Sequence, residues 1–118
     1  FQSVLQSSDL VIGMAGTAVE QAVGLSKPVL QLPGGGPQFT SAFAEAQRRL
    51  LGPTVFYATG AACSTENLDA SAELCMDLLS RSNTDQKLQR CCRKEAQRRL
   101  GNQGGGLRMA EAISSLLP

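Results

Sequence analysis

Residues 9–57 read DLVIGMAGTAVEQAVGLSKPVLQLPGGGPQFTSAFAEAQRRLLGPTVFY, and the pattern within them decides the fold. Three apolar runs, at residues 10–14, 27–33 and 54–58, predict buried strands. Two amphipathic stretches between them, at residues 17–24 and 37–52, predict helices. An alternation of strand and helix is typical of a parallel sheet joined by right-handed crossovers. The sequence therefore predicts an α/β fold, with a Rossmann-like parallel sheet and flanking helices.

The remainder, from about residue 64 to residue 118, carries a helical pattern. Ser64 or Thr65 is placed to cap one helix and Thr84 to cap another, and three glycines precede a last helix. The predicted apolar faces are Phe39, Phe43, Ala46 and Leu50; Leu68, Ala72, Cys75 and Leu79; and Leu88, Cys92, Ala96 and Leu100. We expect residues 1–118 to form a single domain, and the helical pattern that starts at the first residue suggests part of a longer protein.

The composition argues against two classes of partner. The chain has a net charge of +1 and only 4% aromatic residues, so it has neither the basic field nor the stacking surfaces typical of nucleic-acid binding. No apolar run reaches the roughly 18 residues that a membrane span needs, and the first residues do not resemble a signal peptide. We therefore expect a cytoplasmic protein that does not bind nucleic acid.

The residue types present also limit the chemistry. Histidine is absent, which excludes Ser-His-Asp and Cys-His catalysis by this chain. Among the four cysteines, Cys91 and Cys92 are adjacent and no pair has the CxxC spacing, so we expect reduced structural cysteines and no metal centre. Any chemistry depends on carboxylates or on groups outside this chain.

The first candidate binding segment follows the first predicted strand. In an open parallel sheet, ligands bind beyond the carboxyl ends of the strands, where helix amino termini direct backbone amides at anions. The turn from Gly13 to Gly16 allows close approach of a ligand, and Glu20 lies one turn into the next helix, where its carboxylate would accept both hydroxyls of a ribose. Alternatively, Thr17 and Glu20 form a T-x-x-E capping box, and the spacing alone favours that interpretation.

The second candidate segment is PGGGPQFTSA, at residues 33–42. Its three glycines and the amino end of the following helix place free amides and the side chains of Gln38, Thr40 and Ser41 beside the first segment. Glycine loops before helices are common connectors, so this segment is informative only together with the first.

The ordered pair of segments resembles the donor-site region of a family related to lipid A disaccharide synthase, and is more distantly similar to the peptidoglycan N-acetylglucosaminyltransferase. The resemblance covers about residues 9–57. It implies the carboxyl-terminal half of a GT-B fold, so that this chain would be a partial nucleotide-sugar-binding domain. It also implies a UDP-sugar donor and, in the full-length protein, an inverting, metal-independent glycosyltransferase without a cofactor.

The same resemblance implies roles for individual residues. Glu20 would bind the donor ribose, Thr17 and nearby amides would face the diphosphate, and Gln38 would reach the sugar hydroxyls. Ser41 stands where the peptidoglycan enzyme has an asparagine. The predicted substrate-binding residues are Gly13, Ala15, Gly16, Thr17, Glu20, Gly35, Gly36, Gln38, Phe39 and Ser41. No catalytic residue is expected in this chain, because the general base would lie on an amino-terminal, acceptor-binding domain.

Two other functions share these features. A UDP-GlcNAc 2-epimerase has the same fold with a similar turn and glutamate, and a noncatalytic binding or assembly domain would keep the fold alone. A further expectation concerns the basic helix at residues 85–100, which is placed to contact anionic lipid headgroups if the acceptor is membrane-borne. Because Asp85 and Glu95 are interleaved with its cations and large apolar side chains are scarce, the sequence favours an ordinary solvated face.

Overall fold

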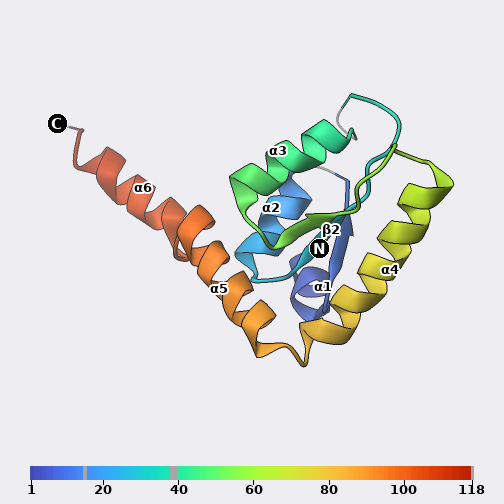
Figure 1. The fold of residues 1–118 in the computed structure, drawn as a ribbon. Coiled ribbons are helices and arrows are strands. Elements are labelled where there is room, and N and C mark those ends of the chain that lie inside the picture. Colours follow the sequence, from blue (N-terminus) through green and yellow to red (C-terminus); the bar gives the residue numbers. More distant parts are fainter. Residues whose placement is uncertain (15, 38–39, 118) are drawn as a thin grey trace.

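The computed structural model describes residues 1–14, 16–37 and 40–117, which form a three-layered α/β domain with one projecting helix (Figure 1). The elements are α1 (Gln2–Ser7), β1 (Val11–Gly13), α2 (Thr17–Gly24), β2 (Val29–Gln31), α3 (Ser41–Leu51), β3 (Val55–Tyr57), α4 (Thr65–Ser82), α5 (Gln86–Leu100) and α6 (Gly105–Ser114). All three strands are parallel, in the order β1-β2-β3. The predicted α/β architecture, with a parallel sheet and flanking helices, is confirmed.

One face of the sheet is covered by the two crossover helices, α2 and α3. Val11, Val29 and Val55 stand opposite one another in the strand register, so their side chains project to the same face. There they pack against Val19 and Leu51, among others. This layer follows directly from the right-handed β-α-β connections, which place successive crossover helices on the same side of the sheet.

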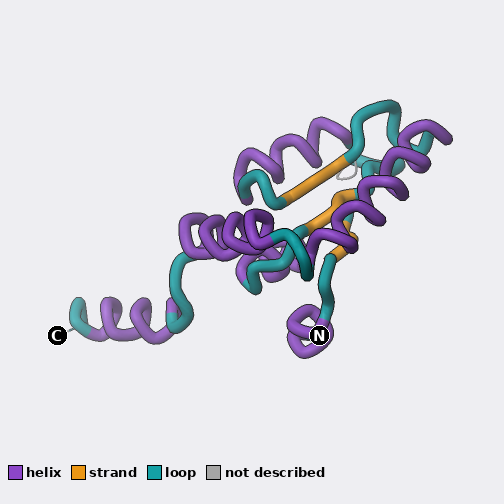
Figure 2. The backbone as a smooth tube through the Cα atoms, turned by 60° about the horizontal axis from the view of Figure 1, so that its bottom comes forward, coloured by secondary structure: helices purple, strands orange, loops and turns teal. Residues whose placement is uncertain are grey.

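The opposite face is covered by α4 together with Leu88 and Cys92 of α5, so the strands lie between helices in Figure 2. Leu30 of β2 packs there with Leu78, Leu88 and Cys92, and Phe56 borders the same cluster. The rest of α5 contacts α2 and α3. Because both faces are covered, all three residues of β2 are buried. A central strand of a parallel sheet is expected to be apolar throughout for this reason.

Two helices begin later than the sequence predicts. The first residue of α3 is Ser41, not Pro37, because the Thr40 hydroxyl accepts a hydrogen bond from the Phe43 amide and so caps the helix at that point. In α5 the cap is Asp85 and not Thr84, because a carboxylate accepts hydrogen bonds from two amides of the first turn. Ser64 caps α4, as predicted.

The buried faces of α3 and α4 are also displaced by one position from the predicted ones. The buried residues of α3 are Ala44, Gln47 and Leu51, and those of α4 are Asn67, Ser71 and Leu78. Leu50, predicted to be in the core, is 61% exposed. The apolar spacing misplaced each buried face by one position because one polar residue in each helix is buried through a hydrogen bond: Gln47 in α3 and Asn67 in α4. The face of α5 is predicted correctly at Leu88, Cys92 and Ala96.

A buried amide pair joins the sheet to α3. Gln31, the last residue of β2, donates from Nε2 to Oε1 of Gln47 at 2.8 Å, and both side chains are buried. The Oε1 atom of Gln31 accepts no hydrogen bond from the described residues. Removing either partner should therefore lower the free energy of unfolding substantially, because leaving a buried amide unpaired costs much more than a hydrogen bond contributes.

We predict that Gln47→Ala lowers the free energy of unfolding by about 2 kcal/mol, because the Gln31 amide then loses its acceptor inside the core. The double substitution of Gln31 and Gln47 by methionine should lie closer to the wild-type value, since it removes both polar partners together. Urea denaturation of the three proteins measures these differences. Gln6→Ala, at an exposed position of α1, is the control, and a Gln47→Ala protein as stable as this control would contradict the prediction.

All four cysteines are free thiols, and they differ in burial. Cys92 lies within the core cluster between α5 and the sheet, whereas Cys63 is exposed. Burial raises the pKa of the Cys92 thiol to about 11, because the charged thiolate is disfavoured away from water.

This pKa shift predicts a pH dependence of stability. Between the ordinary value of 9.0 and about 11, the unfolded chain has lost the Cys92 proton while the folded chain retains it, so stability should fall as pH rises through this window. Cys92→Ala should remove that part of the pH dependence. The measurement is the difference between the unfolding free energies of the two proteins at several alkaline pH values, and a difference that does not change with pH would refute the assignment.

Candidate functional site

The loops that follow the three strands lie at the carboxyl edge of the sheet, because neighbouring parallel strands end on the same side. The Leu32 amide donates to the Gly13 carbonyl at 3.3 Å, which joins the end of β1 to the loop after β2. The Ser41 hydroxyl donates to the Gly60 carbonyl at 3.4 Å, which joins the start of α3 to the loop after β3. The structure therefore brings the two predicted binding segments to one edge of the sheet.

The first turn of α2 begins at a glycine. Gly16 is the N-cap residue, with φ 86° and ψ −164°, a backbone conformation that a side chain disfavours. Among the described residues other than its chain neighbours, no atom lies within 4 Å of a Cβ atom added at Gly16, so these residues leave space beside the turn. Gly13 is more confined, since a Cβ atom there would lie 3.1 Å from the Val19 side chain.

The capping box favoured by the sequence is not formed. Thr17 is the first helical residue and not the cap, and among the described residues no side chain caps the amino end of α2. Its predicted partner Glu20 therefore stands four positions after the cap, whereas a capping box requires the third position. That interpretation was wrong because Gly16, whose φ is positive, occupies the cap position, so the helix starts one residue earlier than a cap at Thr17 would place it.

The polar groups of this turn have no partner within the described part of the chain. Thr17 is exposed and Glu20 is half-buried, and neither side chain makes a hydrogen bond or ion pair with another described residue. The first amides of a helix have no intrahelical acceptor, and they carry a partial positive charge. The turn thus offers donors for an anion and, one turn later, a carboxylate acceptor.

The second segment lies in the loop between β2 and α3. Gly35 and Gly36 are exposed there, and Gly36 has a positive φ of 111°. Thr40 is committed to capping α3, and Ser41 to its contact with Gly60. Three predicted site residues, Ala15, Gln38 and Phe39, lie outside the described residues, so the predicted approach of Gln38 to Glu20 stays a prediction.

Asn67, in the first turn of α4, positions the third loop of this edge and was not predicted. Its Nδ2 atom donates to the carbonyls of Ala58 and Thr59, both at 3.1 Å, and the side chain is buried. These bonds hold the loop that reaches Ser41 through Gly60. The sequence signal for this role is that a polar residue, Asn67, directly precedes the apolar Leu68 at the start of the predicted helix.

Three cavities among the described residues are lined by none of the residues of the two predicted binding segments. One of about 570 Å³ lies between α1, α2 and the segment before α6, and another of about 340 Å³ lies between the ends of α3 and α5. The third, of about 200 Å³, is lined by Lys27 and Arg93 and lies at the amino ends of β1 and β2. Lys27 is therefore placed at the sheet edge opposite the predicted binding segments.

Two further properties bear on the chemistry. Within residues 1–14, 16–37 and 40–117, no group of three His, Cys, Asp or Glu side chains is placed to hold a metal ion. No helix of the described chain combines the length and the apolar character needed to cross a membrane.

Comparisons with protein-family models, with curated proteins and with solved structures gave no match. The fold is therefore described from its strand order alone, as an open three-stranded parallel sheet of Rossmann-like type. The functional interpretation depends on the geometry of the carboxyl edge.

The role of Asn67 can be tested directly. We predict that Asn67→Ala lowers the free energy of unfolding by about 2 kcal/mol, because the buried carbonyl of Ala58 and the partly buried carbonyl of Thr59 lose their donor. Amide hydrogen exchange at residues 58–64 should accelerate more than exchange in the strands. Asn83→Ala, at an exposed position, is the matched control, and equal exchange rates in the two variants would show that Asn67 does not hold the loop.

Proposed function

We propose that this chain is the donor-binding half of a UDP-sugar-dependent glycosyltransferase of the GT-B type, related to lipid A disaccharide synthase. The observation that carries the proposal is the amino end of α2, where the glycine cap leaves Thr17 and Glu20 without the structural role that would otherwise explain them. The sequence resemblance of residues 9–57 and the parallel sheet support the same conclusion.

Each group of the turn has a function in this proposal. The diphosphate of the donor lies against the first amides of α2 and the Thr17 hydroxyl, where the helix dipole favours negative charge. The absence of a side chain at Gly16 allows the phosphates to approach the backbone closely. The Glu20 carboxylate accepts hydrogen bonds from the two ribose hydroxyls, and Gln38 contacts the sugar.

The proposed reaction is an inverting transfer of a hexosyl or N-acetylhexosaminyl group to an acceptor, which includes lipid-linked acceptors. The departing UDP would be stabilised by helix amino termini, whose dipoles are already oriented toward the developing charge. The general base and the acceptor groove belong to a separate amino-terminal domain. The isolated chain is therefore expected to bind a nucleotide and not to turn over a substrate.

Titration with UDP and with UDP-GlcNAc tests the assignment. In a nuclear magnetic resonance experiment, millimolar UDP should shift the amide signals of residues 13–20 and 36–41, whereas amides at the amino ends of the strands should not move. A folded sample in which no signal of these two segments moves would reject the donor site.

The role of Glu20 can be separated from general electrostatics. Glu20→Gln should weaken UDP binding by about 10-fold, because a charged acceptor of two ribose hydroxyls becomes a neutral amide. Glu66→Gln is the matched control, since Glu66 also lies in the first turn of a helix at this sheet edge and loses the same charge. An equal effect of the two substitutions would show that Glu20 makes no specific contact.

A further inference from the structure

The loop between β3 and α4, residues 58–64, is held at both ends by one residue. The Nδ2 atom of Asn67 donates to the carbonyls of Ala58 and Thr59 at the start of the loop, both at 3.1 Å. At the end of the loop, the Asn67 amide donates to the Ser64 hydroxyl at 3.1 Å. Because the Asn67 side chain is only 1% exposed, its Nδ2 atom has no alternative partner in bulk water, and the β3–α4 loop depends on these contacts.

Within the β3–α4 loop, Gly60 connects Asn67 to the start of α3. Gly60 has a positive φ of 117°, and a Cβ atom added there would lie 3.7 Å from the Asn67 Cβ atom, so the two residues lie side by side. The Gly60 carbonyl accepts the hydrogen bond from the Ser41 hydroxyl at 3.4 Å. Since Ser41 is the first residue of α3, a single glycine separates Asn67 from the amino end of that helix.

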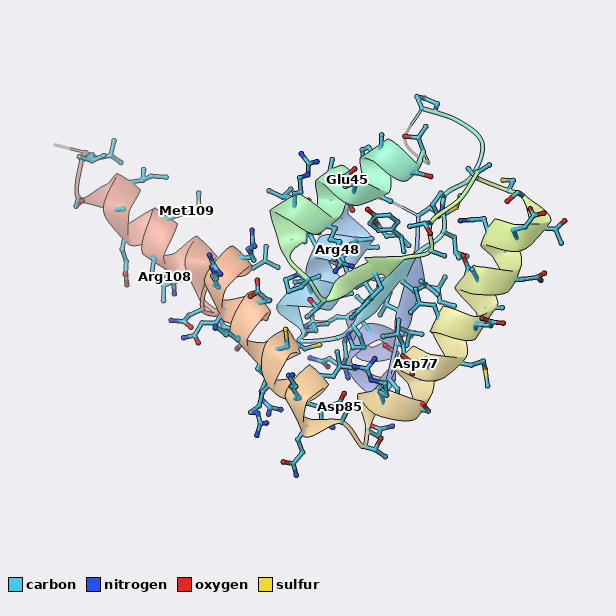
Figure 3. The ribbon with its side chains drawn as sticks, viewed as in Figure 1. Glu45, Arg48, Asp77, Asp85, Arg108 and Met109 are labelled. Carbon is cyan, nitrogen blue, oxygen red and sulfur yellow. The ribbon has the colours of Figure 1, made fainter. Side chains whose placement is uncertain are left out.

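The hydrogen bonds that join α3 to other elements lie in its second half, with one exception. Gln47 makes the buried hydrogen bond to β2, and Arg48 extends toward β3, where it donates to the Val55 carbonyl at 3.1 Å (Figure 3). Arg99 donates to two carbonyls near the end of the helix at 3.0 and 3.1 Å. Among the described residues, the exception is the bond from Ser41 to the β3–α4 loop. The position of the amino end of α3 therefore depends on that loop.

The amino end of α2 has a separate support. Val19, in its first turn, is fully buried in the cluster that contains Val29 of β2, and Gly13 lies close to the Val19 side chain. No hydrogen bond among the described residues joins the β3–α4 loop to α2 or to the turn before it. A change in the β3–α4 loop should therefore move the start of α3 and leave the start of α2 in place.

We propose that Asn67 is a positioning residue that sets the specificity of the candidate site for the sugar part of its ligand. The inference rests on the proposed function, in which the amino end of α2 binds the ribose and the diphosphate, and the segment that leads into α3 contacts the sugar. Asn67 fixes the β3–α4 loop, and the loop fixes the start of α3 and the segment before it. The sugar contacts thus depend on Asn67, whereas the nucleotide contacts do not.

A purely structural role of Asn67 has a different consequence for binding. The buried side chain cannot touch a ligand itself, so it acts either through the fold as a whole or through the start of α3. If Asn67 only stabilised the fold, its removal would lower the folded fraction and weaken the apparent binding of every ligand by the same factor. Displacement of the start of α3 weakens only those ligands that reach it.

Hydrogen exchange without ligand tests the first step. Asn67→Ala should accelerate exchange of the Phe43 and Ala44 amides, which donate to the capping residue of α3, more than exchange of the Val19 amide in the first turn of α2. The comparison with Val19 removes any general loss of stability. An acceleration at Phe43 and Ala44 no larger than that at Val19 would overturn the proposal.

Titrations with UDP and with UDP-GlcNAc test the second step. The wild-type chain should bind UDP-GlcNAc more tightly than UDP, because the sugar adds contacts. Asn67→Ala should weaken UDP-GlcNAc binding by about 5-fold, which corresponds to the loss of about one hydrogen bond, and should leave the Kd for UDP unchanged. Circular dichroism at the titration temperature establishes that the variant is folded.

A second variant alters the same loop without removing Asn67. In Gly60→Ala the added methyl group has space, but alanine disfavours a φ of 117°, so the loop should change its conformation. The same selective loss of UDP-GlcNAc binding is expected. Gly101→Ala is the matched control, because Gly101 also has a positive φ, of 77°, and lies at the end of α5. This control should leave both affinities at the wild-type values.

The outcomes separate this inference from the proposed function. A wild-type chain that does not bind UDP would reject the donor site, and the role of Asn67 in specificity with it. If the wild-type chain binds UDP, equal losses of UDP and UDP-GlcNAc affinity in Asn67→Ala would overturn the role of Asn67 and leave the donor site standing. The same conclusion follows if the wild-type chain binds UDP-GlcNAc no more tightly than UDP, since the start of α3 then contributes no sugar contact.

Discussion

The fold depends on the burial of β2 from both sides. Its three residues alternate between two hydrophobic clusters: Val29 packs with α2 and α3, and Leu30 packs with α4 and α5. Because each cluster contains residues from the strand and from two helices, neither helical layer can be removed without exposing the central strand to water. Gln31 is the last residue of this strand, and its buried hydrogen bond to Gln47 joins the strand to α3.

The parallel arrangement of the strands also determines where polar groups gather. Parallel strands end at a common edge, and the helices that follow them begin there with unpaired amides. Gly16 then decides how α2 starts: it occupies the cap position ahead of Thr17 with a positive φ, which leaves Glu20 without a capping function. The backbone conformation of Gly16 therefore determines both where α2 begins and which side chains are available at the proposed donor site. Helix α6 lies outside this constraint, because none of its residues is buried.

Much of the architecture was predictable from local patterns. The positions of the three strands and the extent of α2 follow from apolar runs bounded by glycine and proline, which act over a few residues. The buried faces of α3 and α4 were not predictable in this way, because Gln47 and Asn67 are buried through hydrogen bonds to residues outside their own helices. For the candidate site, the sequence pointed to this edge of the sheet and to Glu20. It favoured a capping box wrongly, because the T-x-x-E spacing does not specify the backbone conformation of Gly16.

The repeated segment EAQRRL shows most directly what was determined at each level. In both copies, at residues 45–50 and 95–100, the sequence by itself determines a helix, because every residue in it is a good helix former. Only the tertiary structure decides which side is buried. Glu45 pairs with Arg49 in solvent with its side chain 48% exposed, whereas the Glu95 side chain is 7% exposed and pairs with Arg99, which also binds carbonyls at the end of α3. Helix formation depends on local backbone preferences, but burial depends on which surface the rest of the chain presents to each helix.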